Sequence, residues 1–206
     1  MQRMKRAALS LLLVSFLAAC GGPPPNLDSP GHTIVCLGDS ITAGVGAAPE
    51  ESYPARLAER LGRPVVNAGV SGDTAADGLA RVPEVLAQDP WLVIVELGGN
   101  DLLRQVPIEE TEKSLRTVVE RLLAARVLPV LVEVRGPFGH RYRDLFARLH
   151  HDYRAPLVDG VLGDILTDPS LKSDEVHPNA AGYRKLAEGV AEKIEPLLTK
   201  RTRLGR

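Results

Sequence analysis

Five short apolar runs alternate with longer segments of helical periodicity, and this alternation constrains the fold of the chain more than any other feature. Residues 110–126 and 183–197 carry apolar side chains at the spacing of a helix with one buried face. Near-continuous apolar strands joined by such helices indicate a parallel sheet covered on both faces. We therefore expect an α/β fold, a three-layer α/β/α domain with a five-stranded parallel sheet. The expected strands are residues 33–37, 64–67, 91–97, 128–134 and 156–158.

The beginning of the chain has a different composition from the rest. Three basic side chains lie within residues 3–6, and an almost wholly apolar run follows at residues 7–17. This run is shorter than the roughly 20 residues that a helix needs to cross a hydrocarbon layer. Two alanines then lead to Cys20. Charge, length and ending together predict a secretory signal peptide over residues 1–19.

The end of this leader, Leu-Ala-Ala-Cys at residues 17–20, resembles the bacterial lipobox, in which the cysteine is acylated and becomes the new N-terminus. The alternative is an ordinary cleavable signal whose cysteine is incidental. We expect lipidation at Cys20 and therefore a membrane anchor through that lipid. The protein would then lie in the bacterial cell envelope, facing the periplasm or at the outer membrane if the source has one.

The rest of the chain divides into three expected parts. Residues 20–31 contain a Gly-Gly-Pro-Pro-Pro run and form a tether, residues 32–200 form one folded domain, and residues 201–206 form a basic C-terminal tail. Without the three basic residues of the leader, 22 basic and 26 acidic residues remain, for a net charge of −4. This balance gives no electrostatic reason to expect a nucleic-acid partner. Cys36 lies inside an apolar run and is expected to be a buried thiol.

Small, polar and reactive residues follow the expected strands. Gly-Asp-Ser at residues 38–40 follows the first strand, residues 68–73 follow the second, and Gly-Gly-Asn-Asp at residues 98–101 follows the third. Residues 174–179 follow the fifth strand at longer range. Ligands of open α/β sheets bind beyond the carboxyl ends of the strands. The sequence therefore places a candidate site at this edge.

Three of these side chains fit the roles that acyl transfer requires. Ser40, in a glycine-flanked turn, is the candidate nucleophile, and His177 is the candidate base because its ordinary pKa lies near neutrality. Asp174, three residues earlier, is placed to hold the imidazole. The candidate oxyanion donors are the backbone N–H groups of Ser40 and Gly72 and the side-chain amide of Asn100. Each residue also has a structural alternative, in a turn, a positive-φ position or a helix cap.

Other polar residues near these motifs are expected to have structural roles. We expect Asp39, Asp73 and Asp101 to support the backbone and Asn179 to cap the last helix. Glu96, in an otherwise apolar strand, is unusual and receives no catalytic role. The histidines within residues 140–151 lie among arginines, so a solvated basic face is favoured there over a metal site.

The motifs resemble the four blocks of the GDSL, or SGNH, hydrolase family, in order and over about residues 33–198. The matching residues are Gly38-Asp39-Ser40-Ile41, Gly72, Gly99-Asn100-Asp101 and Asp174-x-x-His177. Residues 66–74, 78–81 and 95–101 are more narrowly similar to the branch of periplasmic thioesterase I, lysophospholipase L1 and arylesterase enzymes. Ile41 stands where the family name has leucine, and the segment from His140 to Pro156 is short for that branch, so no chain-length preference is carried over.

This resemblance implies a flavodoxin-like fold and a serine esterase acting on acyl esters, thioesters or lysolipids. It implies Ser40, Asp174 and His177 as the triad, Ser40, Gly72 and Asn100 as the oxyanion hole, and no cofactor or metal. A monomer is expected. The alternative enzyme is a carbohydrate O-acetyl esterase, although few aromatic residues are present for a sugar-stacking cleft. The alternative outside catalysis is an inert binding lipoprotein.

Overall fold

A parallel five-stranded sheet with the strand order β2-β1-β3-β4-β5 forms the centre of the molecule. The computed structural model describes residues 23–135 and 140–204. The order is the flavodoxin-like one, and the expected α/β/α architecture is confirmed. Predicted and observed strand ends agree within two residues. The strands are β1 (Thr33–Gly38), β2 (Val65–Gly69), β3 (Pro90–Glu96), β4 (Leu128–Val132) and β5 (Leu157–Val158).

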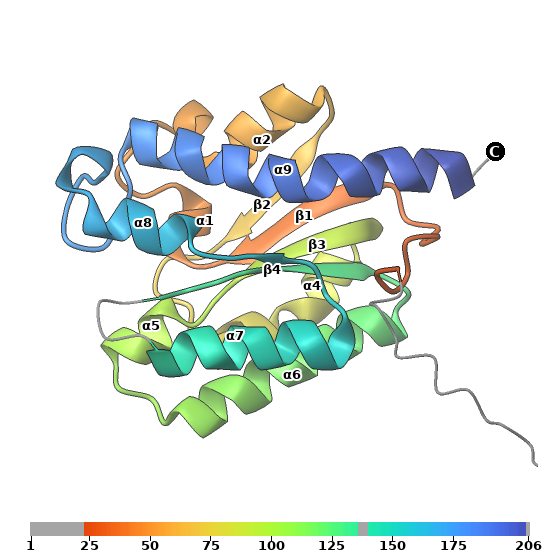
Figure 1. The fold of residues 1–206 in the computed structure, drawn as a ribbon, viewed down its shortest axis with the longest axis horizontal. Coiled ribbons are helices and arrows are strands. Elements are labelled where there is room, and N and C mark those ends of the chain that lie inside the picture. The colour runs from red at the N-terminus through yellow and green to blue at the C-terminus, as the bar shows by residue number, and fades with distance from the viewer. Residues whose placement is uncertain (1–22, 136–139, 205–206) are drawn as a thin grey trace, which may run out of the picture.

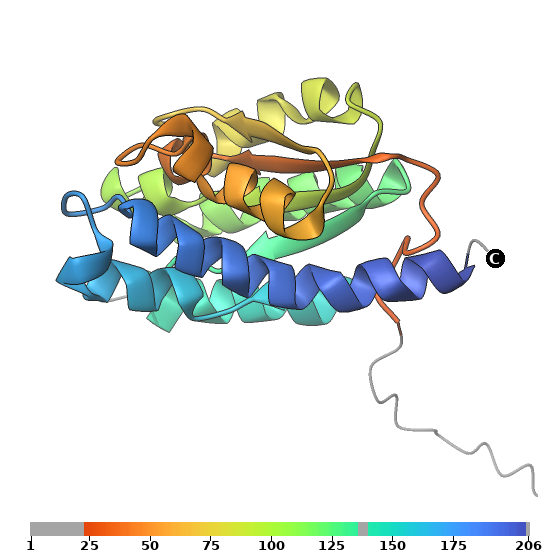
Figure 2. The same cartoon turned by 90° about the horizontal axis from the view of Figure 1, so that it is seen from above.

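Helices cover both faces of this sheet. In Figure 1, α2 and α9 lie on one face and α6 and α7 on the other. The longest helix, α9, runs along the length of the molecule (Figure 2). The helices are α1 (Ser40–Ala43), η1 (Pro49–Glu51), α2 (Tyr53–Leu61), α3 (Ala75–Ala80), α4 (Val82–Leu86), α5 (Gly99–Leu103), α6 (Ile108–Ala124), α7 (His140–Tyr153), α8 (Val161–Thr167), η2 (Pro169–Leu171) and α9 (Ala180–Leu204). None of the helices in these ranges has the length and apolar character needed to cross a bilayer.

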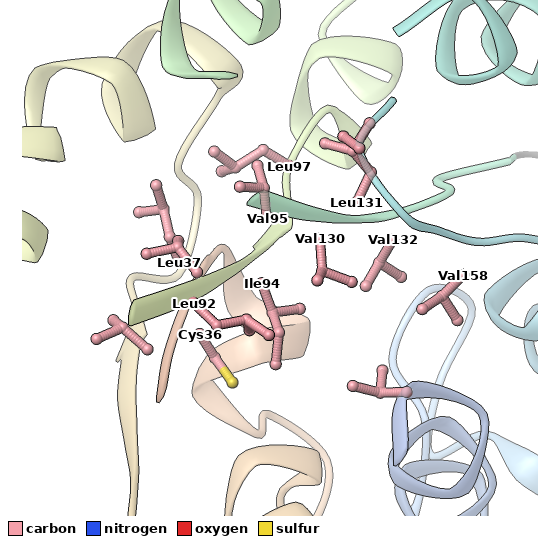
Figure 3. Close-up of a cluster of buried hydrophobic side chains, with 14 of the residues drawn as sticks. Cys36, Leu37, Leu92, Ile94, Val95, Leu97, Val130, Leu131, Val132 and Val158 are labelled. Carbon is pink, nitrogen blue, oxygen red and sulfur yellow. The ribbon is translucent and has the colours of Figure 1, made fainter. Parts of the chain in front are cut away.

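The apolar side chains of the central strands form the core. Successive residues point to opposite faces of the sheet, so that Val130 and Val132 lie on one side of β4 and Leu131 on the other (Figure 3). Both faces are covered by helices, and these three side chains are fully buried. Cys36 is buried in the same core beside Ile94 of β3, as predicted, and burial raises the pKa of its thiol to about 12.

The packed domain extends beyond both predicted boundaries, residues 32 and 200. The amide of Asn26 donates hydrogen bonds to the backbone carbonyls of Leu123 and Val127 at 3.0 and 3.2 Å. Arg201, predicted to begin a tail, is part of α9. Its guanidinium donates to the carbonyls of Ser29 and Gly31 at 2.9 and 2.7 Å.

This difference has a simple physical reason. A Gly/Pro-rich start and a basic end are typical of a tether and a tail, but here the arginine satisfies the carbonyls of the entering chain. The arginine also lies 4.7 Å from the centre of the Trp91 ring, a favourable cation–π position. Residues 1–19, Cys20 and the last two residues of the predicted tail lie outside the described residues.

The carboxyl ends of the strands lie at the end of the molecule opposite the C-terminus. α1 and α5, which follow β1 and β3, lie there together with α8 (Figure 1). Because the strands are parallel, their polar endings meet at this one edge. The candidate residues are therefore found here.

Candidate active site

Ser40 is the first residue of α1, directly after β1. The carboxylate of Asp39 caps this short helix by accepting a hydrogen bond from the N–H of Ile41 at 2.9 Å. At Gly38, a Cβ atom would lie 1.9 Å from the Thr42 hydroxyl, so any larger residue would displace α1. This close packing of strand end and helix fixes a half-buried serine at the edge of the sheet.

His177 and Asp174 lie in the loop before α9. Oδ1 of Asp174 accepts hydrogen bonds from the backbone N–H groups of Val176 and His177, both at 2.9 Å. Its Oδ2 lies 2.7 Å from Nδ1 of the His177 ring. The bond to His177 and the two backbone bonds lower the pKa of Asp174 to about 2, so this carboxylate is ionised at neutral pH.

The third predicted member completes the chain of contacts. Nε2 of His177 lies 3.0 Å from Oγ of Ser40. The imidazole is therefore held between a carboxylate at one nitrogen and a hydroxyl at the other, which is the arrangement that activates a serine nucleophile. The structure brings together all three residues that the sequence singled out for this role.

The two predicted oxyanion donors from other elements lie on adjacent segments. Asn100 is in α5, and its amide nitrogen donates to Asp39 Oδ2 at 3.1 Å and to the carbonyl of Asp73 at 3.0 Å. Gly72, next to Asp73, has a φ of +89°, which favours glycine. Its carbonyl accepts a hydrogen bond from Arg104 Nη2 at 2.8 Å. Asn100 and Ser40 line the same pocket, and the Gly72 loop contacts Asn100 through Asp73.

Asp39 and Asp101 accept hydrogen bonds from the backbone, as predicted, whereas Asp73 binds Arg81, which itself donates to backbone carbonyls. Asp73 accepts a hydrogen bond from Arg81 at 2.7 Å, and Asp101 accepts one from the N–H of Ala75 at 2.8 Å. Asn179 accepts hydrogen bonds from the first turn of α9, at 3.0 and 3.1 Å, and so caps that helix as expected. These contacts tie the loops at the strand ends to one another.

A pocket of about 340 Å³ opens beside Ser40 and His177. Its wall is mainly apolar, and charged side chains of Arg135, Lys172 and Glu175 also line it. A small carbonyl compound with an apolar chain fits such a site, since the chain leaves water while the carbonyl meets the hydroxyl. The apolar lining residues are Ile41, Leu102, Leu103, Val134, Leu166 and Val176.

Of these apolar pocket residues, only Ile41 was singled out by the sequence motifs. Leu102 and Leu103 directly follow the Asn100-Asp101 motif and remain 36% and 60% exposed. Two leucines next to a polar strand-end motif were the available signal. Val176 lies inside the Asp174-x-x-His177 motif, whereas Leu166 comes from α8, and no local pattern connects it with Ser40.

Glu96 is fully buried at the end of β3, beside this site. Its Oε2 accepts a hydrogen bond from the Thr42 hydroxyl at 2.9 Å, and its carboxyl is within hydrogen-bonding reach of Asp39. Burial, and then the negative charge of Asp39, raise the pKa of Glu96 well above its ordinary value. Within residues 23–135 and 140–204, no group of three or more His, Cys, Asp or Glu side chains is arranged to hold a metal ion.

Comparisons with known proteins identify the family to which the chain belongs. Residues 36–185 match the GDSL-like lipase/acylhydrolase family. The chain is 34% identical over 200 residues to thioesterase 1/protease 1/lysophospholipase L1 of Escherichia coli K12, covering 92% of this chain and 91% of that protein. It is 28% identical to an acetylxylan esterase of Geobacillus stearothermophilus, covering 80% and 94%. The crystal structure of TesA superimposes with a TM-score of 0.74 at 33% identity, covering 81% of this chain and 99% of that one.

Proposed function

Because the chain belongs to the GDSL-like lipase/acylhydrolase family, we propose that it cleaves carboxylic esters or thioesters through an acyl-enzyme formed on Ser40. Family membership makes the chain a carboxylic ester hydrolase. The observation that carries the proposed mechanism is the continuous line of contacts from Asp174 through His177 to Ser40. An inert binding lipoprotein would have no need for this alignment.

In the first half of the reaction, Oγ of Ser40 attacks the acyl carbonyl carbon while Nε2 of His177 takes the hydroxyl proton. The carbonyl oxygen becomes an oxyanion, which the N–H groups of Ser40 and Gly72 and the amide of Asn100 stabilise. The bond to the leaving oxygen or sulfur then breaks, and His177 gives its proton to that atom. The ionised Asp174 stabilises the imidazolium in between.

In the second half, His177 removes a proton from water, and the resulting hydroxide oxygen attacks the carbonyl carbon of the acyl-enzyme. The bond between that carbon and Oγ of Ser40 breaks, and His177 returns the proton to Oγ. The products are a carboxylic acid and the free serine. Each step uses water and the side-chain and backbone groups of this chain.

A fluorophosphonate probe tests this mechanism directly. The wild-type chain should be labelled on Ser40, and Ser40→Ala should lose both labelling and p-nitrophenyl ester turnover, the latter by about 10³-fold or more. Ser170→Ala, a change of an exposed serine outside the pocket, is the matched control and should keep both. Turnover that persists in folded Ser40→Ala would contradict the mechanism.

The apolar pocket supports an acyl chain longer than acetyl as the preferred substrate. Burial of each methylene contributes about 0.8 kcal/mol, so a chain that follows the pocket wall gains binding energy that acetate lacks. Rates on acetyl, hexanoyl and decanoyl esters and thioesters, together with a lysophospholipid, test this preference. A clear preference for acetyl groups would instead favour the carbohydrate O-acetyl esterase.

For localisation we propose export and lipidation at Cys20, after removal of residues 1–19. The support is the leader's basic start, short apolar run and lipobox-like end. Metabolic labelling with an alkyne fatty acid should tag the wild-type chain but not Cys20→Ala. Cys36→Ala removes a thiol inside the sheet and is the matched control, which should remain tagged.

A further inference from the structure

A buried carboxyl group at the end of β3 lies behind the proposed oxyanion site. Glu96 pairs in the sheet with Gly38, the residue two before Ser40. Its Oε2 accepts a hydrogen bond from Thr42 at 2.9 Å, and the Tyr53 hydroxyl lies 3.1 Å from the same threonine oxygen. Glu96, Thr42 and Tyr53 are all fully buried. The direct partner of Oε2 is thus one uncharged hydroxyl group, which the Tyr53 hydroxyl contacts in turn.

The other carboxyl oxygen of Glu96 faces a different situation. Oε1 is buried and, among the residues that the structure describes, makes no well-formed hydrogen bond, although the backbone N–H of Asp39 is near enough to the Glu96 carboxyl to lower its pKa. The carboxyl group of Asp39 is within hydrogen-bonding reach of Glu96. Two ionised carboxylates would repel each other there, whereas one proton shared between them converts the repulsion into a hydrogen bond. A proton on Glu96 therefore allows Oε1 to donate a hydrogen bond to Asp39.

Asp39 connects this pair to the active site. Its Oδ1 accepts from the N–H of Ile41, and its Oδ2 accepts from the amide of Asn100 at 3.1 Å. Asp39 is only 2% exposed, and this burial raises its pKa to about 6 against the lowering effect of these donors, of Glu96 and of His177. Asp39 therefore depends on its donors to remain an acceptor at neutral pH.

We propose that Glu96 is a positioning residue that donates a hydrogen bond to Asp39 and thereby holds the Asn100 amide at the oxyanion site. The inference rests on the proposed function, because Asn100 is the oxyanion donor in that mechanism. Asn100 makes two hydrogen bonds before substrate arrives, to Asp39 and to the carbonyl of Asp73. These two hydrogen bonds orient the N–H groups of the Asn100 amide, and an oxyanion would accept hydrogen bonds from the same N–H groups.

Loss of the Glu96 donor has a defined consequence. Without it the pKa of the buried Asp39 rises, because fewer donors then stabilise its charge, and a larger share of Asp39 is protonated at neutral pH. A protonated Asp39 no longer accepts well from Asn100, and the amide is free to turn. Since the oxyanion forms only on the way to products, the effect falls on kcat more than on KM.

Two substitutions at Glu96 separate this role from a structural one. Glu96→Gln keeps a donor for Asp39 and an acceptor for Thr42, so its kcat should remain within about fivefold of the wild type. Glu96→Leu has no donor, and its kcat should fall about 10- to 100-fold with KM nearly unchanged. Asp39→Asn should cause a similar fall, since its amide would face the amide of Asn100, and it decides the question should Glu96→Leu fail to fold.

Ile94→Val is the control, because Ile94 lies two residues earlier on β3 and is fully buried. It should leave kcat unchanged. Equal kcat values for Glu96→Leu and the wild type, equal losses in Glu96→Gln and Glu96→Leu, or a wild-type kcat in Asp39→Asn would each overturn the inference. Fluorophosphonate labelling of Ser40 is measured in every variant. A wild-type chain that is not labelled would refute the proposed function, whereas labelled Glu96→Leu and Asp39→Asn chains with unchanged kcat would refute only the role of Glu96.

Discussion

The imidazole of His177 lies 3.0 Å from the hydroxyl of Ser40, although 137 positions separate the two residues in the chain. Ser40 begins α1 directly after the first strand, and His177 comes from the loop before the last helix. The parallel sheet brings these two segments to one edge. Their contact depends on Asp174, which fixes the ring from the other side.

Loss of the Asp174 charge should therefore impair catalysis without unfolding the chain. Asp174→Asn keeps the size of the side chain but no longer stabilises an imidazolium, so we expect kcat to fall about 10²- to 10⁴-fold. Steady-state kinetics with a p-nitrophenyl ester measure the effect. Asp168→Asn removes an exposed carboxylate that only supports the η2 turn and serves as the control. A kcat within twofold of the wild type in Asp174→Asn would contradict the assigned role.

A larger side chain at the pocket wall should change chain-length preference. Leu103 lines the pocket and is 60% exposed, so Leu103→Trp is expected to fold and to fill part of the space for an acyl chain. The ratio of kcat/KM for decanoyl over acetyl esters should fall about tenfold, the equivalent of nearly two buried methylene groups. Leu204→Trp, at an equally exposed leucine at the C-terminal end of α9, should leave this ratio unchanged.

The buried carboxyl of Glu96 should make stability decrease as pH rises. Its pKa in the folded chain is well above the ordinary 4.5, so above that pH the folded state retains a proton that the unfolded state releases. Glutamine does not titrate. Glu96→Gln should therefore gain stability relative to the wild type by up to about 1.4 kcal/mol per pH unit in this window.

Urea unfolding between about pH 4 and pH 8 measures this difference, because the range begins near the ordinary pKa of a glutamate and extends well above it. Glu109→Gln, at an exposed glutamate in the first turn of α6, should show no comparable slope. Parallel stability curves for Glu96→Gln and the wild type would show that Glu96 is not protonated in the folded chain.

Arg201 should contribute to stability far more than its neighbour Arg203. The first donates to two backbone carbonyls of the entering chain and lies over Trp91, whereas the second is exposed. We expect Arg201→Met to lower the free energy of unfolding by about 2 kcal/mol and Arg203→Met by less than about 0.5 kcal/mol. Equal effects of the two changes in urea unfolding would place residue 201 in a tail after all.

The periodicity of the sequence was sufficient to predict the fold class and the strand positions. Val130, Leu131 and their neighbours form an uninterrupted apolar run because both faces of the sheet are covered, and this pattern is local. The strand-end motifs were also local, and the general rule for parallel sheets placed them at one edge. The three contacts between Ser40, His177 and Asp174 followed from that rule together with side-chain chemistry.

Contacts between distant segments decided what the sequence left open. Glu96 was visible as a charge in an apolar strand, but only packing against α1 reveals that it meets Thr42 and Asp39. The basic composition around Arg201 is typical of a tail, but its guanidinium donates hydrogen bonds to backbone carbonyls of the entering chain. Periodicity reports which face of an element is buried, whereas the partner of a buried or paired group is set by how elements pack across the chain. The amino-acid sequence by itself therefore determined the sheet and the chemistry available at its edge. Only the tertiary structure decided which side chains form the pocket wall, that Arg201 packs against the entering chain and that Glu96 meets Thr42, because these contacts join elements far apart in the chain.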